Sequence, residues 1–581
     1  MGWWWLGIAA AIIGILWAID MWLLPRPVLR PLVLRIFGKG KKPPLPAPGD
    51  EGSQSITLQI PPPPSGTWRV EARLTIDYVD GLPQAPPKIR DPFLEARQLE
   101  KANKYREAIK LYEACFQPET TPSQRAALHI LIGNCFLRLS ELEEAEGHYR
   151  QAEKPAREGN DLQALSAALG NMGNVYRIKG KLNKALEHHQ QALQIHRDTG
   201  NREGEATQLG NMGIVYQIKG EPDQALEHHQ QALKIHRDIG NRQGEANQLG
   251  NMGVVYKTKG KLDKAVEHYQ QALKIHRDIG NREGEAGDLS SMGIVYQTKG
   301  ELDKALEHHQ QALKIDRDIG NREGEASNLG SMGNVYQTKG ELDKALEHYQ
   351  QALQIHRDIG NRVGEANQWG NMGVVYKTKG KLGEALEHYQ QALQIHRDIG
   401  NRQGEANDLG NMGIVYGIKG ELDKALEHCQ QALKIHRDIG NREGEANQLG
   451  NMGNVYRIKG ELDKALEHHQ QALQIHRDIG NRGGEATQLG NMGIVYRIKG
   501  ELDKALEHHQ QALKIHRDIG NREGEANQLG NMGIVYKAKG ELDKALEHHQ
   551  QALKIFERIG AQEGMEIARR NIAALSKARG S

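Results

Sequence analysis

The sequence predicts an all-α solenoid of helical hairpins. A unit of 40 residues repeats in unbroken register from residue 161 to 560, and such a period is typical of architectures in which each unit packs only on its neighbours. Each unit also carries two helix-like apolar stripes separated by glycine. The 76 basic and 74 acidic residues nearly cancel, so no strong field favours nucleic acid as a partner.

Residues 1–24 predict a single transmembrane helix. The run from Trp3 to Leu24 contains one charged residue, Asp20, and its length suits a hydrocarbon core of about 30 Å. A cleavable signal peptide is the alternative, but no basic stretch precedes the run and no small-residue cleavage site ends it. Because basic residues follow the run, the positive-inside rule places the repeats in the cytoplasm. We therefore expect a single-pass membrane protein anchored through residues 3–24.

Two short regions separate this helix from the repeats. Residues 25–55 are basic and then rich in Pro and Gly, as a linker is, although the part from Val28 to Phe37 could instead lie on lipid headgroups. Residues 56–82 alternate apolar and polar side chains, which favours strands. A lone ribbon is marginal in water, so we expect this segment to dock on the first hairpin, pair with a second copy or accept a partner strand.

The unit that begins at Asn201 shows how the two helices are encoded. Its first helix has an apolar stripe and ends at Gly220, and its second helix begins at Glu221-Pro222 and ends at Gly240, after which Asn241 caps the next helix. We assign residues 161–560 to ten such units. Residues 89–160 read as two divergent units, and residues 561–581 as a C-terminal capping helix.

These residues carry a family resemblance. Small and large side chains alternate as in the tetratricopeptide repeat at Leu209, Met212-Gly213, Tyr216, Gly220, Ala225 and Ala232. The chain resembles that family over roughly residues 91–560, and its 40-residue period is most similar to kinesin light chains and Pins/LGN-type scaffolds. The resemblance implies a right-handed superhelix whose concave wall binds a protein or an extended peptide.

The resemblance also implies which residues bind. In the family, similar asparagines of the first helices hold the backbone of the peptide, and an amide both donates and accepts hydrogen bonds. The candidates are Asn171, Asn211, Asn251, Asn371, Asn411, Asn451, Asn491 and Asn531, interrupted by Ser291 and Ser331. The alternative is that these amides only hydrate the groove.

Cations near this row are candidates for contacts with acidic side chains of the partner. Those at the helix starts are Arg202, Arg242, Arg282, Arg322, Arg442 and Arg522, and those beside the row are Arg177, Lys257, Lys377, Arg457, Arg497 and Lys537. The arginines at the helix starts could instead bond across repeat junctions. Gly210 is expected to face outward beside Asn211, because an interior helical glycine implies the close approach of another group.

No motif of catalysis is present. The sequence has no nucleophile elbow, P-loop, kinase motifs or zinc-protease motif, so we expect neither an enzyme nor a cofactor, and no small-molecule substrate. The recurring histidines, such as His228, His229 and His236, could suggest a metal ladder, but no completing ligands accompany them and packing is favoured. The prediction is a membrane-anchored protein-binding scaffold. Its alternatives are a regulatory subunit of a separate enzyme and an envelope-assembly scaffold with the repeats outside the membrane.

Overall fold

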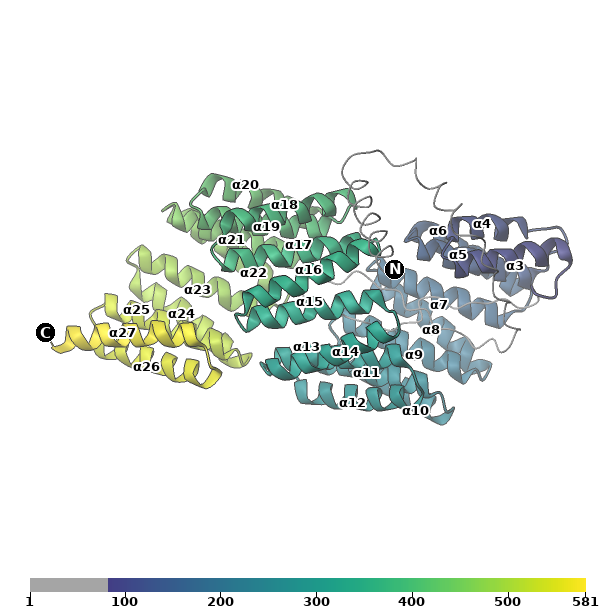
Figure 1. Cartoon of the computed structure of the whole chain (residues 1–581), viewed down its shortest axis with the longest axis horizontal. Helices are drawn as coiled ribbons and strands as arrows, with labels where there is room; N and C mark the ends of the chain where they lie inside the picture. Colours follow the sequence, from purple (N-terminus) through teal and green to yellow (C-terminus); the bar gives the residue numbers. More distant parts are fainter. Residues whose placement is uncertain (1–81, 581) are drawn as a thin grey trace, which may run out of the picture. The chain divides into compact units, whose positions relative to one another are not determined.

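The computed structural model describes residues 82–580, and the regular structure of this part is entirely α-helical (Figure 1). The helices form consecutive hairpins, each made of a first and a second helix. The first helices are α3 (Pro87–Lys101), α5 (Pro122–Arg138), α7 (Leu162–Ile178), α9 (Arg202–Ile218), α11 (Arg242–Thr258), α13 (Arg282–Thr298), α15 (Arg322–Thr338), α17 (Arg362–Thr378), α19 (Arg402–Ile418), α21 (Arg442–Ile458), α23 (Arg482–Ile498) and α25 (Arg522–Ala538).

The second helices return antiparallel beside them, and one further helix ends the chain. The second helices are α4 (Tyr105–Ala114), α6 (Leu142–Glu158), α8 (Leu182–Asp198), α10 (Pro222–Asp238), α12 (Leu262–Asp278), α14 (Leu302–Asp318), α16 (Leu342–Asp358), α18 (Leu382–Asp398), α20 (Leu422–Asp438), α22 (Leu462–Asp478), α24 (Leu502–Asp518) and α26 (Leu542–Ile559); the terminal helix is α27 (Gln562–Gly580). The all-α hairpin solenoid predicted from the repeat is confirmed for residues 82–580.

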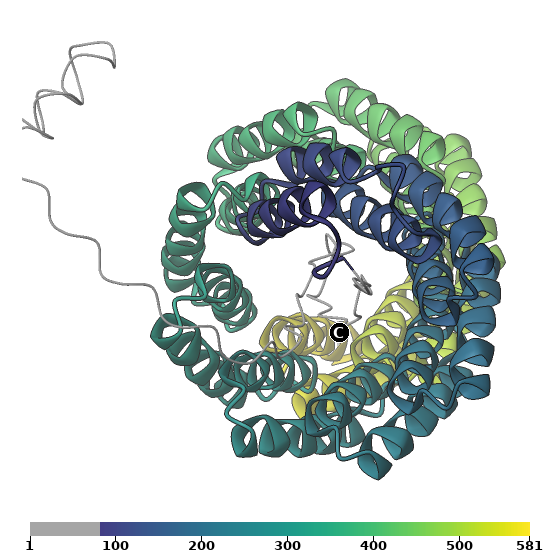
Figure 2. The same cartoon turned by 90° about the vertical axis from the view of Figure 1, so that its right-hand side faces the viewer.

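The hairpins stack side by side in sequence order (Figure 2). Each first helix packs on its own second helix, and that helix packs on the next first helix. The main contacts that skip a helix join neighbouring first helices, for example α19 with α21 and α23 with α25. Helices on the inner side of a curved stack approach one another most closely, so the first helices form its concave side.

From residue 161 to 540, glycine ends the helices of the repeats through one recurring motif. Gly220 has a left-handed backbone with φ of 77°, which glycine adopts without steric cost. Its N–H donates to the carbonyl of Gln217 at 3.1 Å, and the next N–H, of Glu221, donates to the carbonyl of Tyr216 at 2.9 Å. This pair of bonds is the Schellman motif. It confirms the helix end predicted at Gly220, and the same bonds recur at Gly240.

Asparagine begins the following helix. The side-chain oxygen of Asn241 accepts a hydrogen bond from the N–H of Gly244 at 2.7 Å, which satisfies one of the free donors at a helix start. The same cap recurs at Asn201 and Asn281. The 40-residue period is therefore fixed by a glycine stop followed directly by an asparagine cap.

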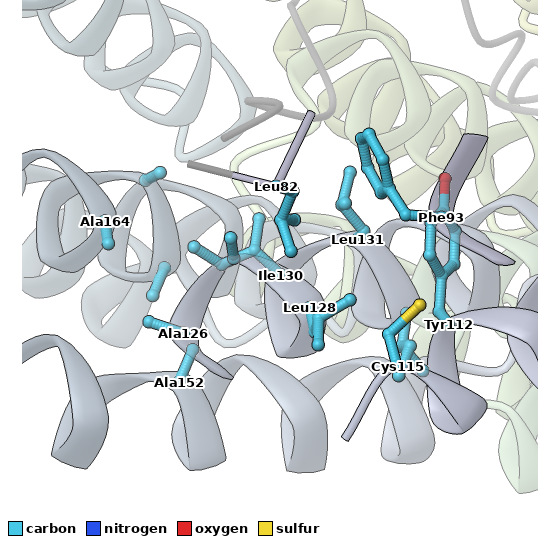
Figure 3. Close-up of a cluster of buried hydrophobic side chains, with 14 of the residues drawn as sticks. Leu82, Phe93, Tyr112, Cys115, Ala126, Leu128, Ile130, Leu131, Ala152 and Ala164 are labelled. Carbon is cyan, nitrogen blue, oxygen red and sulfur yellow. The ribbon is translucent and has the colours of Figure 1, made fainter. Parts of the chain in front are cut away.

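The hydrophobic core runs from hairpin to hairpin. At the N-terminal end it is a cluster in which Leu82 and Phe93 pack with Leu128, Ile130 and Leu131 of α5 (Figure 3). At the C-terminal end, α27 buries Met565, Ala568 and Leu575 against the last hairpins. Both ends of the stack are thus closed by apolar contacts that the repeats alone do not supply.

Some predictions concern residues outside the described part. The transmembrane helix at residues 3–24, the linker at 25–55 and almost all of the strand-like segment at 56–82 precede Leu82, the first described residue. Between residues 82 and 580, no helix is both long and apolar enough to cross a membrane. This same part of the chain contains no β-strand.

Candidate binding surface on the first helices

The asparagine row lies on the side of α7–α25 that faces away from the second helices. We call the surface formed by this row and its neighbours on the first helices the first-helix face. Asn171, Asn211 and Asn251 are buried, whereas the five asparagines from Asn371 to Asn531 and the interrupting serines, Ser291 and Ser331, are half-buried. The predicted row therefore exists as a surface, and its accessible part lies toward the C-terminal repeats.

Few amides of the row form side-chain hydrogen bonds with other residues of the described part. Asn171 donates from Nδ2 to Oδ1 of Asn134 at 3.1 Å, and Asn451 donates to Oε1 of Gln448 at 3.3 Å. The Nδ2 atoms of Asn211 and Asn251 are buried without a hydrogen-bond partner among residues 82–580. Buried donors are normally satisfied, so these two amides retain an unused capacity to bind.

In each first helix from α9 to α25, a buried glutamate pairs with the arginine at its own helix start and with an arginine of the preceding hairpin. Glu205 is buried and receives an ion pair from Arg197 of the preceding helix, with Nε 3.0 Å from Oε1, and another from Arg202. The same arrangement recurs at each junction through Glu525, which Arg517 and Arg522 contact. Each of these buried carboxylates thus joins two consecutive hairpins.

Five of these arginines also reach the end of the second helix of their own hairpin. Arg242 Nη2, for example, lies 3.7 Å from Oδ2 of Asp278, the last residue of α12. The equivalent pairs are Arg202–Asp238, Arg282–Asp318, Arg322–Asp358 and Arg442–Asp478. The guanidinium groups proposed for an acidic partner are thus engaged by carboxylates of their own hairpins, rather than across the repeat junctions.

Gly210 does not face outward as expected. A Cβ atom at this position would lie 2.9 Å from Nε2 of Gln248, which belongs to the next first helix. The close approach that the glycine permits is therefore an approach between two repeats. Gly410, Gly450 and Gly490 lie in the same way beneath Gln448, Gln488 and Gln528.

The histidines adjacent to these glutamines pack inside the repeats. His229 is fully buried over Gly213, where a Cβ would lie 2.7 Å from its ring, and its Nδ1 lies 2.9 Å from Oε1 of Gln248. Burial lowers the pKa of His229 to about 4, so the ring is neutral at physiological pH. His228 lies against the ring of Tyr216 at 4.8 Å. These rings thus pack against neighbouring side chains. Within residues 82–580, no group of three such side chains is placed to hold a metal ion.

One cavity on the first-helix face includes members of the row. It has a volume of about 290 Å³ between α23 and α25, and its lining includes Asn491, Asn531, Thr487, Ile494 and Asn527. Carboxamides and a hydroxyl around an apolar side chain, with the carboxylate of Glu523 beside them, can bind both the backbone and a side chain of a peptide. The cavity thus brings two predicted site residues together.

Exposed isoleucines next to the row were not singled out from the sequence. Ile418, Ile458 and Ile498 stand seven residues after an asparagine of the row, which is two helical turns, and each is about half exposed. The equivalent residues of α11–α17 are threonines. Isoleucine also stands at this position in α7 and α9, as Ile178 and Ile218, so the change between threonine and isoleucine makes α19–α23 more apolar than α11–α17.

Cations accompany these isoleucines. Arg457, Arg497 and Lys537 belong to the predicted set beside the row, and none of them forms an ion pair with a carboxylate of residues 82–580. Arg457 lies close enough to His469 to contribute to the lowering of its pKa. The C-terminal part of the first-helix face therefore combines free positive charge, amides and exposed apolar side chains.

Comparisons with known proteins agree with this architecture. A family model described as tetratricopeptide repeat matches residues 164–238, 206–278, 244–318, 285–358, 324–398, 364–438, 403–478 and 484–558, and a second model of the same description matches residues 93–161. No curated protein matches the sequence.

Two solved structures are similar to parts of the chain. BtubC (BKLC) from P. vanneervenii is 21% identical with a TM-score of 0.31, over 40% of this chain and 91% of its own. The apo form of RapI is 15% identical with a TM-score of 0.38, over 47% of this chain and 98% of its own.

Proposed function

The chain belongs to the tetratricopeptide repeat family, and from that premise we propose that it is a scaffold that holds an extended segment of a protein partner on its first-helix face. The observation that supports this most directly is the half-buried amide row from Asn371 to Asn531. Amides at one position of successive repeats can bind the backbone of an extended chain without selecting its side chains.

The chemistry beside the row indicates what kind of segment fits. Arg457, Arg497 and Lys537 lack carboxylate partners in the described part of the chain, so they favour acidic side chains. Ile418, Ile458 and Ile498 favour apolar side chains. We therefore propose that the partner segment carries both acidic and apolar side chains and binds along α19–α25. Several weak, equivalent contacts along one segment gain affinity through their linkage.

A capture experiment tests this function. The full chain, and the variant Asn451→Ala, Asn491→Ala and Asn531→Ala, are used to capture proteins from native membranes. A matched control changes three exposed amides of the second helices at the same spacing, Gln471→Ala, Gln511→Ala and Gln551→Ala. We expect a partner that the control retains and the asparagine variant loses. Equal capture by all three proteins would contradict binding at this face.

We also propose that the scaffold is tethered to a membrane through residues 3–24, with the repeats in the cytoplasm. The support is the apolar run and the basic residues that follow it. Membrane fractionation under alkaline extraction tests the tether: we expect the full chain in the pellet and a chain without residues 1–27 in the supernatant. A full chain released by alkali would contradict the tether.

A further inference from the structure

Another cavity lies among the second helices, on the side of the stack opposite to the first-helix face. It has a volume of about 430 Å³ and lies between α12 and α14, over α13. Its floor consists of the buried apolar side chains of Leu273, Leu289 and Met292. Its rim consists of polar and charged side chains, namely Gln270, Lys274, Arg277, Asp278, His308 and Gln311. We call this cavity the outer groove.

At one other junction, the chain fills the equivalent groove with its own side chain. Trp369 of α17 holds the position in its repeat that Leu289 holds in α13. Its indole lies beside His388, with ring centroids 5.1 Å apart, and Cζ of Arg357 lies 5.4 Å from the indole centroid. A cation over the face of an aromatic ring is attracted to it. The indole is half-buried, whereas Leu289 is buried, so the indole reaches from the floor toward the surface between α16 and α18.

A divergent N-terminal repeat also places a ring here. His129 of α5 holds the position of Leu289 and Trp369 in its own repeat. Its ring lies 5.4 Å from that of His148, which is equivalent to His388. Aromatic rings thus occupy this place at two junctions, whereas the outer groove, with leucine at the same position, is open.

The guanidinium group that faces the indole has a counterpart that is already fixed in the outer groove. Nε of Arg277 donates to the buried Glu285 at 2.8 Å, and Nε of Arg357 donates to the buried Glu365 at 2.9 Å. Arg277 is therefore held by the same bond as the arginine that faces Trp369. A group that is fixed before binding loses little conformational freedom when a ligand arrives.

The histidine on the other helix of the outer groove is fixed as well. Nδ1 of His308 lies 2.8 Å from the carbonyl oxygen of Lys304, and the His308 ring lies 4.9 Å from that of Tyr296. His388 forms the equivalent contacts beside Trp369. Both groups that contact the indole in the filled groove are thus present around the open one.

The charge of the outer groove suits an aromatic ring. Lys274 stands on the rim where the filled groove has Gln354, and no carboxylate within residues 82–580 forms an ion pair with Lys274. Asp278, the one carboxylate on the rim, lies 3.7 Å from Nη2 of Arg242. Positive charge therefore predominates at the rim, and it attracts the negative face of an aromatic ring.

We propose that the outer groove binds an aromatic side chain of a protein partner, with the ring between Arg277 and His308. The carboxamides of Gln270 and Gln311 on the rim can bind the backbone on either side of that side chain, which favours a protein segment over a free aromatic compound. Trp369 closes the equivalent groove to such a ring. The site goes beyond the proposed function, because it gives the scaffold a second contact place on the opposite side of the stack.

Photolabelling of the full chain tests the proposal. The probe is the N-acetyl amide of a phenylalanine that carries a diazirine on its ring. Trypsin releases the floor of the outer groove in residues 283–299 and that of the filled groove in residues 363–377, and these peptides differ in sequence. We expect at least about fivefold more label on residues 283–299, since the ring gains a cation contact only in the open groove. An excess of N-acetyltryptophanamide should suppress this label, and N-acetylleucinamide should not.

Exchanging the two floor residues gives matched variants. Leu289→Trp fills the outer groove as α17 fills its own, and it should lower the label on residues 283–299 at least about fivefold. Trp369→Leu opens the filled groove, and the label on residues 363–377 should rise to within about twofold of that on residues 283–299, as expected for two independent sites. Each variant carries a residue that the chain itself uses at that position, and thermal melting checks that it folds.

Several outcomes would overturn the proposal. These are equal labelling of the two peptides in the unaltered chain, label that persists in folded Leu289→Trp, and equal suppression by the two competitors. Should Leu289→Trp not fold, His308→Ala, which removes one of the two ring contacts, takes its place and should lower the same label. None of these results bears on the asparagine row, because the groove lies on the side of α13 that faces the second helices.

Discussion

His229 Nδ1 lies 2.9 Å from Oε1 of Gln248, and this buried hydrogen bond joins the second helix of one repeat to the first helix of the next. The same bond recurs between His189 and Gln208, His469 and Gln488, and His509 and Gln528. Apolar contacts between repeats are compatible with many registers, whereas a buried polar pair is satisfied in only one. These bonds therefore select how adjacent repeats dock.

Replacing Gln248 by Met should lower the free energy of unfolding by about 1–3 kcal/mol, because the buried Nδ1 of His229 loses its partner. Urea unfolding followed by circular dichroism measures the change. Gln231→Met is the matched control, since Gln231 is exposed and donates to Glu227 of its own helix at 3.3 Å. This control should change the free energy of unfolding by less than about 0.5 kcal/mol. Equal effects of the two substitutions would show that the junction bond does not stabilise the stack.

Alanine substitution at two glycines of α25 should change the free energy of unfolding in opposite directions. A Cβ at Gly533 would lie 2.8 Å from His549, whereas a Cβ at Gly530 would meet nothing within 4 Å. Gly533→Ala should lower the free energy of unfolding by about 1–3 kcal/mol through overpacking, and Gly530→Ala should raise it by about 0.5–1 kcal/mol through helix propensity. Hydrogen exchange of α25 measures both, and destabilisation by Gly530→Ala would contradict the open space beside that glycine.

Stability should fall in mild acid because of the buried histidines. Burial lowers the pKa of His189, His229, His309, His469 and His509 to about 4, against about 6.5 in an unfolded chain. Above pH 6.5 both states are neutral, and the full stability is present. As the pH falls from 6.5 to 4, the unfolded chain binds protons that the folded chain does not, so each histidine costs up to about 3 kcal/mol.

Denaturant unfolding at pH 7, 6 and 5 measures this loss. His229→Tyr removes one titrating group and places there the residue that Tyr269 supplies in the next repeat, so its stability should fall less steeply with pH. Stability that is unchanged between pH 7 and 5 would contradict the buried, neutral state of these rings.

Substituting an arginine at a helix start should affect stability, whereas substituting the asparagine row should affect partner binding. Arg442→Ala removes ion pairs to the buried Glu445 and to Asp478, and it should lower the free energy of unfolding by about 1–3 kcal/mol because Glu445 loses part of its compensation. Partner capture should persist under conditions where the variant is folded. If the folded Arg442→Ala variant no longer captured the partner, Arg442 would have to be part of the binding surface.

The helix ends were predictable from sequence because their signals are local. Gly220 and Asn241 fix a helix stop and a helix start through bonds within a few residues, and the 40-residue period repeats them. The same reasoning placed the amide row on the first helices, since side chains at helical spacing share a face.

The contacts around the site could not be predicted from local sequence signals, because many of them join residues of different helices or repeats. The partner of Gly210 is Gln248, one repeat away, so the glycine could not be assigned to a junction from its own helix. Glu205 pairs with Arg202 of its own helix and also with Arg197 of the preceding helix, and this second pair bridges two helices. The burial of Arg177 differs from that of Arg457 although the two hold the same position in their repeats, and only the arrangement in space distinguishes them.

The affinity of one identified partner for three purified proteins tests most directly whether the asparagine row binds. These proteins are the unaltered chain, the Asn451→Ala, Asn491→Ala and Asn531→Ala variant, and the Gln471→Ala, Gln511→Ala and Gln551→Ala control, each measured by calorimetry beside its thermal melting. We expect at least about tenfold weaker binding for the asparagine variant only, which is about 1.4 kcal/mol, with nearly unchanged melting of all three. Unchanged affinity, or a loss of affinity that tracks a loss of stability, would contradict a binding face built from this row.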